Sequence, residues 1–184
     1  MAVFVVLAVV TFFPTIFGKS TTNEPIDQKN LSIDLSKFST DSVKKITIAN
    51  KGEDEKVLSI RNGKWFIGDD EADSKKIDQL FADFSTLKVE DMVSQNSENQ
   101  ANLEVTKETG IQLTISTGGD DAVFFIGGKA APSGTFSIRK DGIKNVYQAS
   151  GSLRTDLLQS TDEWKKKVDE SSKASESLES KDIR

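Results

Sequence analysis

The chain of 184 residues contains no cysteine and no histidine. Without cysteine it can form no disulfide bond, and it offers no thiolate for catalysis, for zinc binding or for the attachment of a bacterial lipid. Without histidine it lacks the commonest general base and the commonest metal ligand among protein side chains. These absences exclude most of the usual catalytic and metal-binding arrangements, and we expect no catalytic residue, no metal and no cofactor.

The balance of charge excludes a further class of partner. The chain carries 24 lysine and arginine residues against 29 aspartate and glutamate residues, and its isoelectric point is about 4.9. An acidic surface repels the phosphate backbone, so nucleic acid is not an expected partner. Hydrophobic residues make up 36% of the chain, which is enough for the core of one modest domain.

One long apolar segment stands at the start of the chain, where residues 2–17 (AVFVVLAVVTFFPTIF) carry no charge. As a helix, this segment would span roughly 24 Å, somewhat less than the ~30 Å hydrocarbon core of a bilayer. Its large apolar side chains surround the helix rather than forming one stripe, which disfavours a helix buried in a soluble core. We therefore predict a transmembrane anchor at residues 1–18, so that the membrane is one partner of the chain.

A signal sequence is the alternative interpretation of residues 1–18. Such a sequence normally begins with basic residues and ends in a small-x-small cleavage site, and neither is present here. A start further upstream that carried a few lysines would supply both the missing length and the missing charge. Because Lys19 is the one charged residue close to the apolar run, charge does not fix the orientation in the membrane.

Three segments follow the predicted anchor. Residues 19–40 are polar and contain Pro25, which predicts a linker. Residues 41–167 carry the patterned sequence of one α+β domain. Residues 168–184 are rich in serine, lysine and glutamate, which predicts a polar, flexible tail.

Alternating apolar residues predict strands at 43–50, 56–61 and 64–67. Asn62-Gly63 between the last two is a strong hairpin signal, because both turn positions need a positive φ. Apolar residues at helical spacing then predict a helix over residues 74–87, capped by Asp73 or Ser74 and covering the sheet with one face.

The second half of the domain repeats this order. A short strand near Met92 and an irregular crossing precede strands that are predicted at 111–115, 122–126, 135–139 and 146–148. Segment 122–126 is apolar on both faces and predicts a central strand. Asp141-Gly142 is a second hairpin signal, and residues 152–159 predict a short helix. We expect an α+β fold with a mainly antiparallel sheet, built from two hairpin-plus-helix units.

Two segments contain residues of the kind that bind ions. Residues 127–134 (GGKAAPSG) combine glycines with Lys129, so backbone amides and this lysine could hold an anion. A tight connection between strands explains the same segment and is the favoured interpretation. The acidic residues at 69–73 lack the ligand spacing of an EF-hand, and a solvated loop with a helix cap accounts for them.

The domain resembles a bacterial family known as domain of unknown function 4340. The resemblance rests on the following motifs, in order: VKKITI from residue 43, NGKW from 62, ADS from 72, LKV from 87, FIGGK from 125, PSGTFSIR from 132, NVY from 145 and WKKK from 164. The chain departs from the family pattern at residues 99–109, where relatives usually have a short glycine-bearing helix.

The resemblance implies a membrane-tethered domain outside the cytoplasm, held at the cell membrane by a single span. Some relatives occur beside transporter components of the gliding-motility type, which implies an accessory role. The family has no established catalytic residues. Its most recurrent stretch contains Lys129, Ser133 and Arg139, which we predict as a contact surface.

We therefore expect a non-catalytic, membrane-anchored extracytoplasmic domain that serves as accessory or scaffold in a membrane complex and meets a protein partner there. The alternative is a module that binds a soluble ligand or a cell-wall polymer, through a groove near Lys129 and exposed aromatic side chains.

Overall fold

The structure is a computed structural model that describes residues 33–128 and 134–167. The predicted anchor, most of the predicted linker and the predicted tail lie outside these residues. In the part of the chain that is described, no helix has the length and apolar character needed to cross a bilayer.

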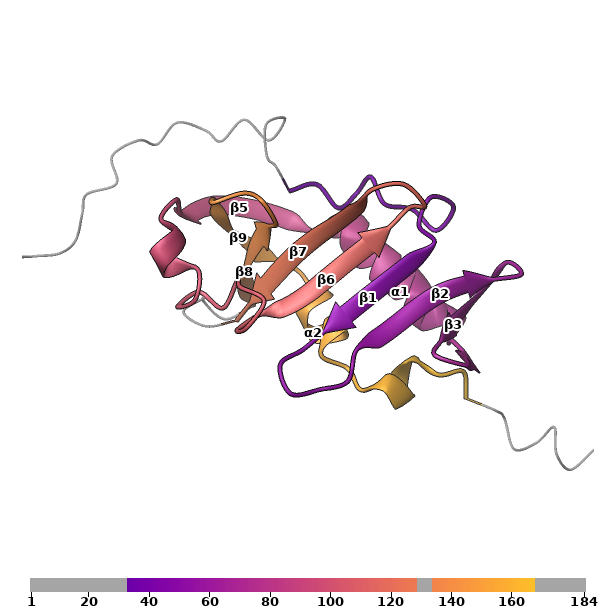
Figure 1. The fold of residues 1–184 in the computed structure, drawn as a ribbon. Coiled ribbons are helices and arrows are strands. Elements are labelled where there is room, and N and C mark those ends of the chain that lie inside the picture. The colour runs from indigo at the N-terminus through magenta and orange to yellow at the C-terminus, as the bar shows by residue number, and fades with distance from the viewer. Residues whose placement is uncertain (1–32, 129–133, 168–184) are drawn as a thin grey trace, which may run out of the picture.

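Within the described residues, nine strands form one antiparallel sheet (Figure 1). The strands are β1 (Lys45–Ala49), β2 (Lys56–Arg61), β3 (Lys64–Ile67), β4 (Asp70–Glu71), β5 (Lys88–Ser94), β6 (Ile111–Ser116), β7 (Asp121–Gly127), β8 (Thr135–Lys140) and β9 (Val146–Ser150). Their order across the sheet is β4-β3-β2-β1-β6-β7-β8-β9-β5. The mainly antiparallel α+β class is thus confirmed, and β7 lies inside the sheet as the sequence predicts.

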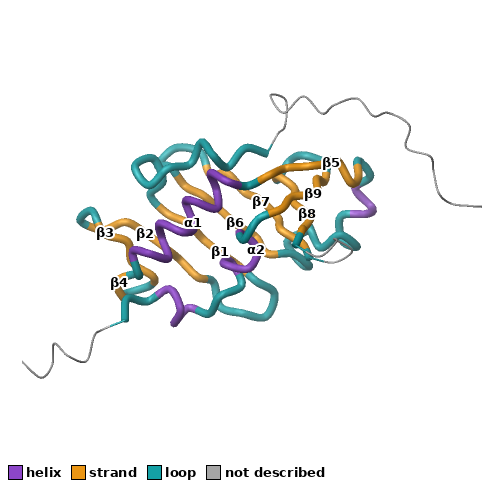
Figure 2. The backbone as a smooth tube through the Cα atoms, turned by 180° about the vertical axis from the view of Figure 1, so that it is seen from behind, coloured by secondary structure: helices purple, strands orange, loops and turns teal. Residues whose placement is uncertain are grey.

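The helices α1 (Ser74–Thr86) and α2 (Leu153–Leu157) both lie on one face of the sheet, as the view from behind shows (Figure 2). Strand residues on that face are apolar and buried, with Ile46 opposite Leu58 on one side and opposite Ile115 on the other. Because strand side chains alternate between faces, this single covered face fixes the register of the whole sheet.

Helix α1 forms where the sequence predicts it. Its first turn is capped by Asp73, whose Oδ1 accepts a hydrogen bond from the Lys75 amide at 2.9 Å. The apolar face of α1 packs into the core through Ile77, Leu80, Phe81 and Phe84, all of them buried. Burial of this stripe, more than helix propensity, stabilises the helix.

The last described segment of the chain lies against the start of α1. The 3-10 turn η3 (Thr161–Trp164) follows α2, and the Trp164 side chain is 1% exposed. The carbonyl oxygen of Trp164 accepts a hydrogen bond of 2.8 Å from the Asp73 amide. This contact joins the last described segment to the beginning of α1.

The two predicted hairpins close by different turns. Asn62 and Gly63 both have positive φ, of 51° and 76°, as a two-residue hairpin turn requires. In the connection between β8 and β9 only Gly142 has a positive φ, and the Ile143 amide donates to the Lys140 carbonyl at 3.2 Å. The second connection is therefore longer than a two-residue turn.

The strands do not form two separate units. The order strands, helix, strands, helix is confirmed, but β5 follows α1 and pairs with β9 at the far edge of the sheet. The pairing between β1 and β6 joins the two halves in the middle of the sheet. One continuous sheet results.

The predicted boundary between linker and domain, at residue 41, lies too far along the chain. Ile33, Leu35 and Phe38 are buried in the main core, and the Phe38 ring meets the edge of the Phe124 ring with centroids 6.3 Å apart. The segment is short and mostly polar, so its few apolar residues do not raise the local hydrophobicity enough to distinguish it from a linker. The folded region includes residues 33–40.

We expect Leu35→Ala to lower the free energy of unfolding by about 2–5 kcal/mol, because this side chain is 2% exposed and its removal leaves a cavity. Urea unfolding monitored by tryptophan fluorescence measures the change. Thr40→Ala, at an exposed position of the same segment, should change stability by less than about 0.5 kcal/mol. Equal effects of the two substitutions would contradict the placement of residues 33–38 in the core.

Candidate functional site

Two of the three predicted contact residues, Lys129 and Ser133, lie outside the described residues. The preceding Gly128 is described, and its amide donates a hydrogen bond of 3.2 Å to Glu104 Oε2. A carboxylate of the chain itself therefore occupies one backbone amide that an external anion would have used.

Arg139, the third predicted contact residue, is buried and only 7% exposed. Its Nε donates to the Val105 carbonyl at 2.9 Å, and its guanidinium lies 4.6 Å from the centre of the Phe125 ring. Burial lowers the pKa of Arg139, and the nearby Asp141 opposes that shift. Arg139 thus holds a loop on the sheet rather than contributing to an exposed contact surface.

That loop comprises residues 97–110 and contains the 3-10 turn η2 (Ser97–Asn99). Its backbone passes so close to β7 that a Cβ atom on Gly127 would lie 2.0 Å from the Leu103 carbonyl oxygen. Val105 from the loop packs with Phe125 and Val146 in a small second core. The loop therefore covers the β7–β9 end of the sheet face that bears no helix.

The acidic residues at 69–73 are explained by local pairing. Asp73, one of the two residues that the sequence offers as the cap of α1, is the N-cap of this helix. Glu71 meets Lys166 at 3.0 Å and Lys64 at 3.3 Å, and hydrogen bonds from these two lysines lower the pKa of Glu71. Asp70 pairs with Lys165 at 3.1 Å. The cluster is an exposed network that joins β4 to the chain end of the domain.

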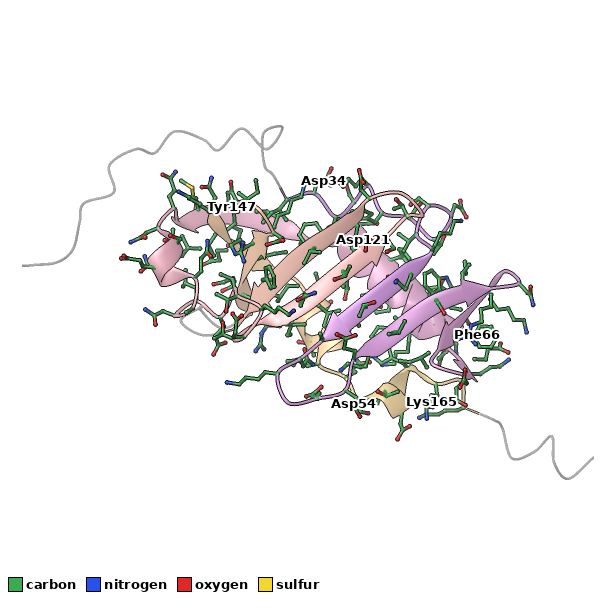
Figure 3. All side chains as sticks on the ribbon, in the orientation of Figure 1. Asp34, Asp54, Phe66, Asp121, Tyr147 and Lys165 are labelled. Carbon is green, nitrogen blue, oxygen red and sulfur yellow. The ribbon has the colours of Figure 1, made fainter. Side chains whose placement is uncertain are left out.

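Over β3, β2, β1 and β6, the face of the sheet that bears no helix is not covered by the loop (Figure 3). We call this part the open face. At its centre three β-branched side chains lie side by side across three strands, in the order Val57, Thr47 and Thr114. Val123 on β7 continues this row to the edge of the loop, where it packs against the small second core. All four are partly exposed, which is typical of a flat surface of short side chains.

A second row crosses the open face beside the first. It runs from Phe66 on β3 through Ser59, Lys45 and Ser116 to Asp121 on β7, and Figure 3 labels its two ends. Arg61 lies over the Phe66 ring, with its guanidinium carbon 5.2 Å from the ring centre. The open face is thus weakly polar at its centre, with charged and aromatic side chains along one side.

A cavity of about 330 Å³ lies where β1 ends and β6 begins. Its lining carries charges of both signs and consists of Ala49, Asn50, Lys51, Glu55, Lys107, Glu108 and Gln112. Asn50 donates through Nδ2 to Glu53, whereas its Oδ1 is buried and accepts no hydrogen bond within the described residues. The cavity adjoins the open face, because Ala49 and Gln112 are neighbours in the sheet.

The sequence pattern did not reveal one pair of carboxyl groups, in which Asp83 is buried and Asp156 half-buried. Asp83 on α1 is 4% exposed, and it lies within hydrogen-bonding reach of Asp156 on α2. Burial, followed by the proximity of Asp83, raises the pKa of Asp156 to about 6. Within residues 33–128 and 134–167, no three acidic side chains gather as metal ligands, so the two carboxyl groups form a pair and not a metal cluster.

Fold and surface define a two-layer α+β domain with one helix-covered sheet face and one open face. A family model described as domain of unknown function (DUF4340) matches residues 65–174, more than half of the 184-residue chain, and the chain belongs to this family. The match begins in β3, whereas β1 and β2 precede it and complete the same sheet. No curated protein and no solved structure matches the chain.

The close approach of the loop to β7 leads to a prediction about Gly127. Gly127→Ala should destabilise the domain by about 1–3 kcal/mol, because the added methyl group would overlap the Leu103 carbonyl and force the loop to move. Gly119→Ala is the matched control, since a Cβ there meets nothing within 4 Å and its φ is not positive. Thermal unfolding compares the two, and equal melting temperatures would show that the loop does not lie against β7.

Proposed function

We propose that this protein is a non-catalytic, membrane-anchored extracytoplasmic domain that docks onto a protein of a transporter-type membrane complex. The apolar run at residues 2–17 supports the membrane anchor. The resemblance noted above supports the accessory role. The observation that carries the proposal is the open face, where a row of short side chains crosses several strands.

The chemistry of the open face suits a protein partner. Its central row of Val57, Thr47, Thr114 and Val123 presents methyl and hydroxyl groups and no charge. Charged residues are depleted at the centres of protein interfaces and more frequent at their rims. Lys45, Arg61 and Asp121 lie along one side of the central row. Since β-branched side chains lose little rotamer entropy, ordering this surface against a partner costs little.

Membrane attachment is testable in the full-length chain. The protein should stay in the membrane fraction after carbonate washing, and Val6→Lys together with Val9→Lys should release it, since each lysine costs about 3 kcal/mol near the centre of a membrane helix. The same number of lysines at exposed domain positions, Asp78→Lys with Asp120→Lys, should leave it membrane-bound. A wild-type chain found in the aqueous fraction would contradict the anchor.

Docking through the open face is testable by site-specific photo-crosslinking in native membranes. A photoreactive phenylalanine derivative at position 114 should form an adduct with one membrane-complex protein, because Thr114 lies at the centre of the central row. The same probe at position 78, exposed on α1 on the opposite side of the sheet, should form none.

A second substitution distinguishes docking from chance proximity. Thr47→Arg, next to Thr114 in the row, should reduce the adduct from position 114 at least several-fold, whereas Thr40→Arg outside the open face should not. Adducts that form equally well from positions 78 and 114, or from neither, would contradict the proposed docking surface.

The alternative function is the binding of a soluble ligand or a cell-wall polymer. The specific observation that favours it is the cavity beside β1 and β6, which has charges of both signs and the polar Asn50 in its lining. Anionic glycans added to the protein should then raise its melting temperature by mass action. Asn50→Ala should abolish that rise, whereas it should leave the photo-crosslink from position 114 intact.

A further inference from the structure

The carboxyl groups of the buried Asp83 and the half-buried Asp156 lie together between α1 and α2. Asp83 Oδ1 accepts hydrogen bonds from Gln79 Nε2 and from Ser152 Oγ, each at 2.9 Å. Asp156 Oδ1 accepts one from Gln159 Nε2 at 3.0 Å. Donors within the described residues thus satisfy one oxygen of each carboxyl group.

The second oxygen of each group has no such donor. Asp83 Oδ2 and Asp156 Oδ2 are both buried, and neither has a hydrogen-bond partner among the described residues. An unpaired buried acceptor is costly, and two buried carboxylates side by side repel each other. One proton between the two groups would remove both costs, because the protonated carboxyl group donates to the other.

We propose that Asp83 and Asp156 share one proton in the folded protein and that this proton fastens α2 to α1. Loss of the proton leaves two negative charges at the contact between the helices. The contact then weakens, and with it the attachment of α2 and of the η3 segment that follows. The stability of the contact between α1 and α2 therefore depends on pH.

The surroundings of the pair do not neutralise its second charge. On α1, the half-buried Lys76 faces the pair but donates its hydrogen bond of 2.8 Å to Gln159 Oε1. On β2, the buried Lys56 donates to the Gln159 carbonyl at 2.7 Å and lies 3.5 Å from Glu53. On α2 itself, the Arg154 guanidinium packs against Gly128. Lys76 and Lys56 are thus held by other partners, and the effect of Lys76 on the pKa of Asp156 is the smallest of its causes.

The pH range of the effect follows from the direction of the shift. Because the pKa of Asp156 is raised from 3.8 to about 6 on folding, the folded state binds more protons than the unfolded state between these values. Stability therefore falls as pH rises towards and through about 6. The carboxylates with lowered pKa values, such as Glu71 and Glu90, titrate below this range and do not contribute to it.

The absence of histidine makes the experiment clean, since no ordinary side chain titrates between pH 5.0 and 7.5. In urea unfolding of the full-length chain in detergent, the folding equilibrium constant should be about tenfold larger at pH 5.0 than at pH 7.5. Asp156→Asn should remove this difference and be more stable than wild type at pH 7.5, because its amide donates permanently to Asp83.

Asp78→Asn, at an exposed position of α1, is the matched control and should keep the tenfold difference. A variant Asp156→Asn that retains the pH dependence, or a wild type equally stable at both pH values, would overturn the proposal. If Asp156→Asn does not fold, the carboxyl carbon of Asp156 in the wild-type chain is titrated by NMR. A midpoint near 6 supports the shared proton, and a midpoint near the ordinary value of about 4 overturns it.

Discussion

Burial of one face of a single antiparallel sheet beneath α1 is the constraint on which the rest of the structure depends. The apolar stripe of α1 meets the alternate strand residues, and this contact sets which residues of every strand point inward. A one-residue slip in β1 would exchange Ile46 and Ile48 for Thr47 and Lys45 in the core. The same constraint places Thr47 and the other short side chains of the central row on the opposite face of the sheet.

Sheet faces without a helix need another cover or must tolerate water. At the β7–β9 end the loop of residues 97–110 provides that cover, and Arg139 fastens it through the Val105 carbonyl. The approach is close because Gly110 and Gly127 have no side chain, and a Cβ at either position would overlap the loop backbone. Over β1, β2, β3 and β6, residues 33–128 and 134–167 form no such loop, and this surface is the one we propose for docking.

Much of the fold could be predicted because the relevant signals are local. Alternation in β1 and β6, the Asn62-Gly63 turn, and the apolar spacing of α1 each reflect the period of one element, and each is confirmed. The start of the domain was placed too late, because Ile33, Leu35 and Phe38 are separated by polar residues and have no periodic context. The pairing of β5 with β9 could not be predicted either, since strand order depends on contacts between distant segments.

The sequence by itself determined the period of each element, a cap of α1 at Asp73 or Ser74, and the lack of cysteine and histidine chemistry. Only the tertiary structure decided which polar residues are buried. Arg139 alternates with Ile138 and so belongs to the solvent side by its strand period, yet a loop from elsewhere in the chain covers it. Asp83 flanks the apolar stripe of α1 and is buried only because Asp156 and α2 pack over it. The spacing of apolar residues is a property of one segment of the chain. A charged side chain is buried only when a second segment packs over it and excludes water.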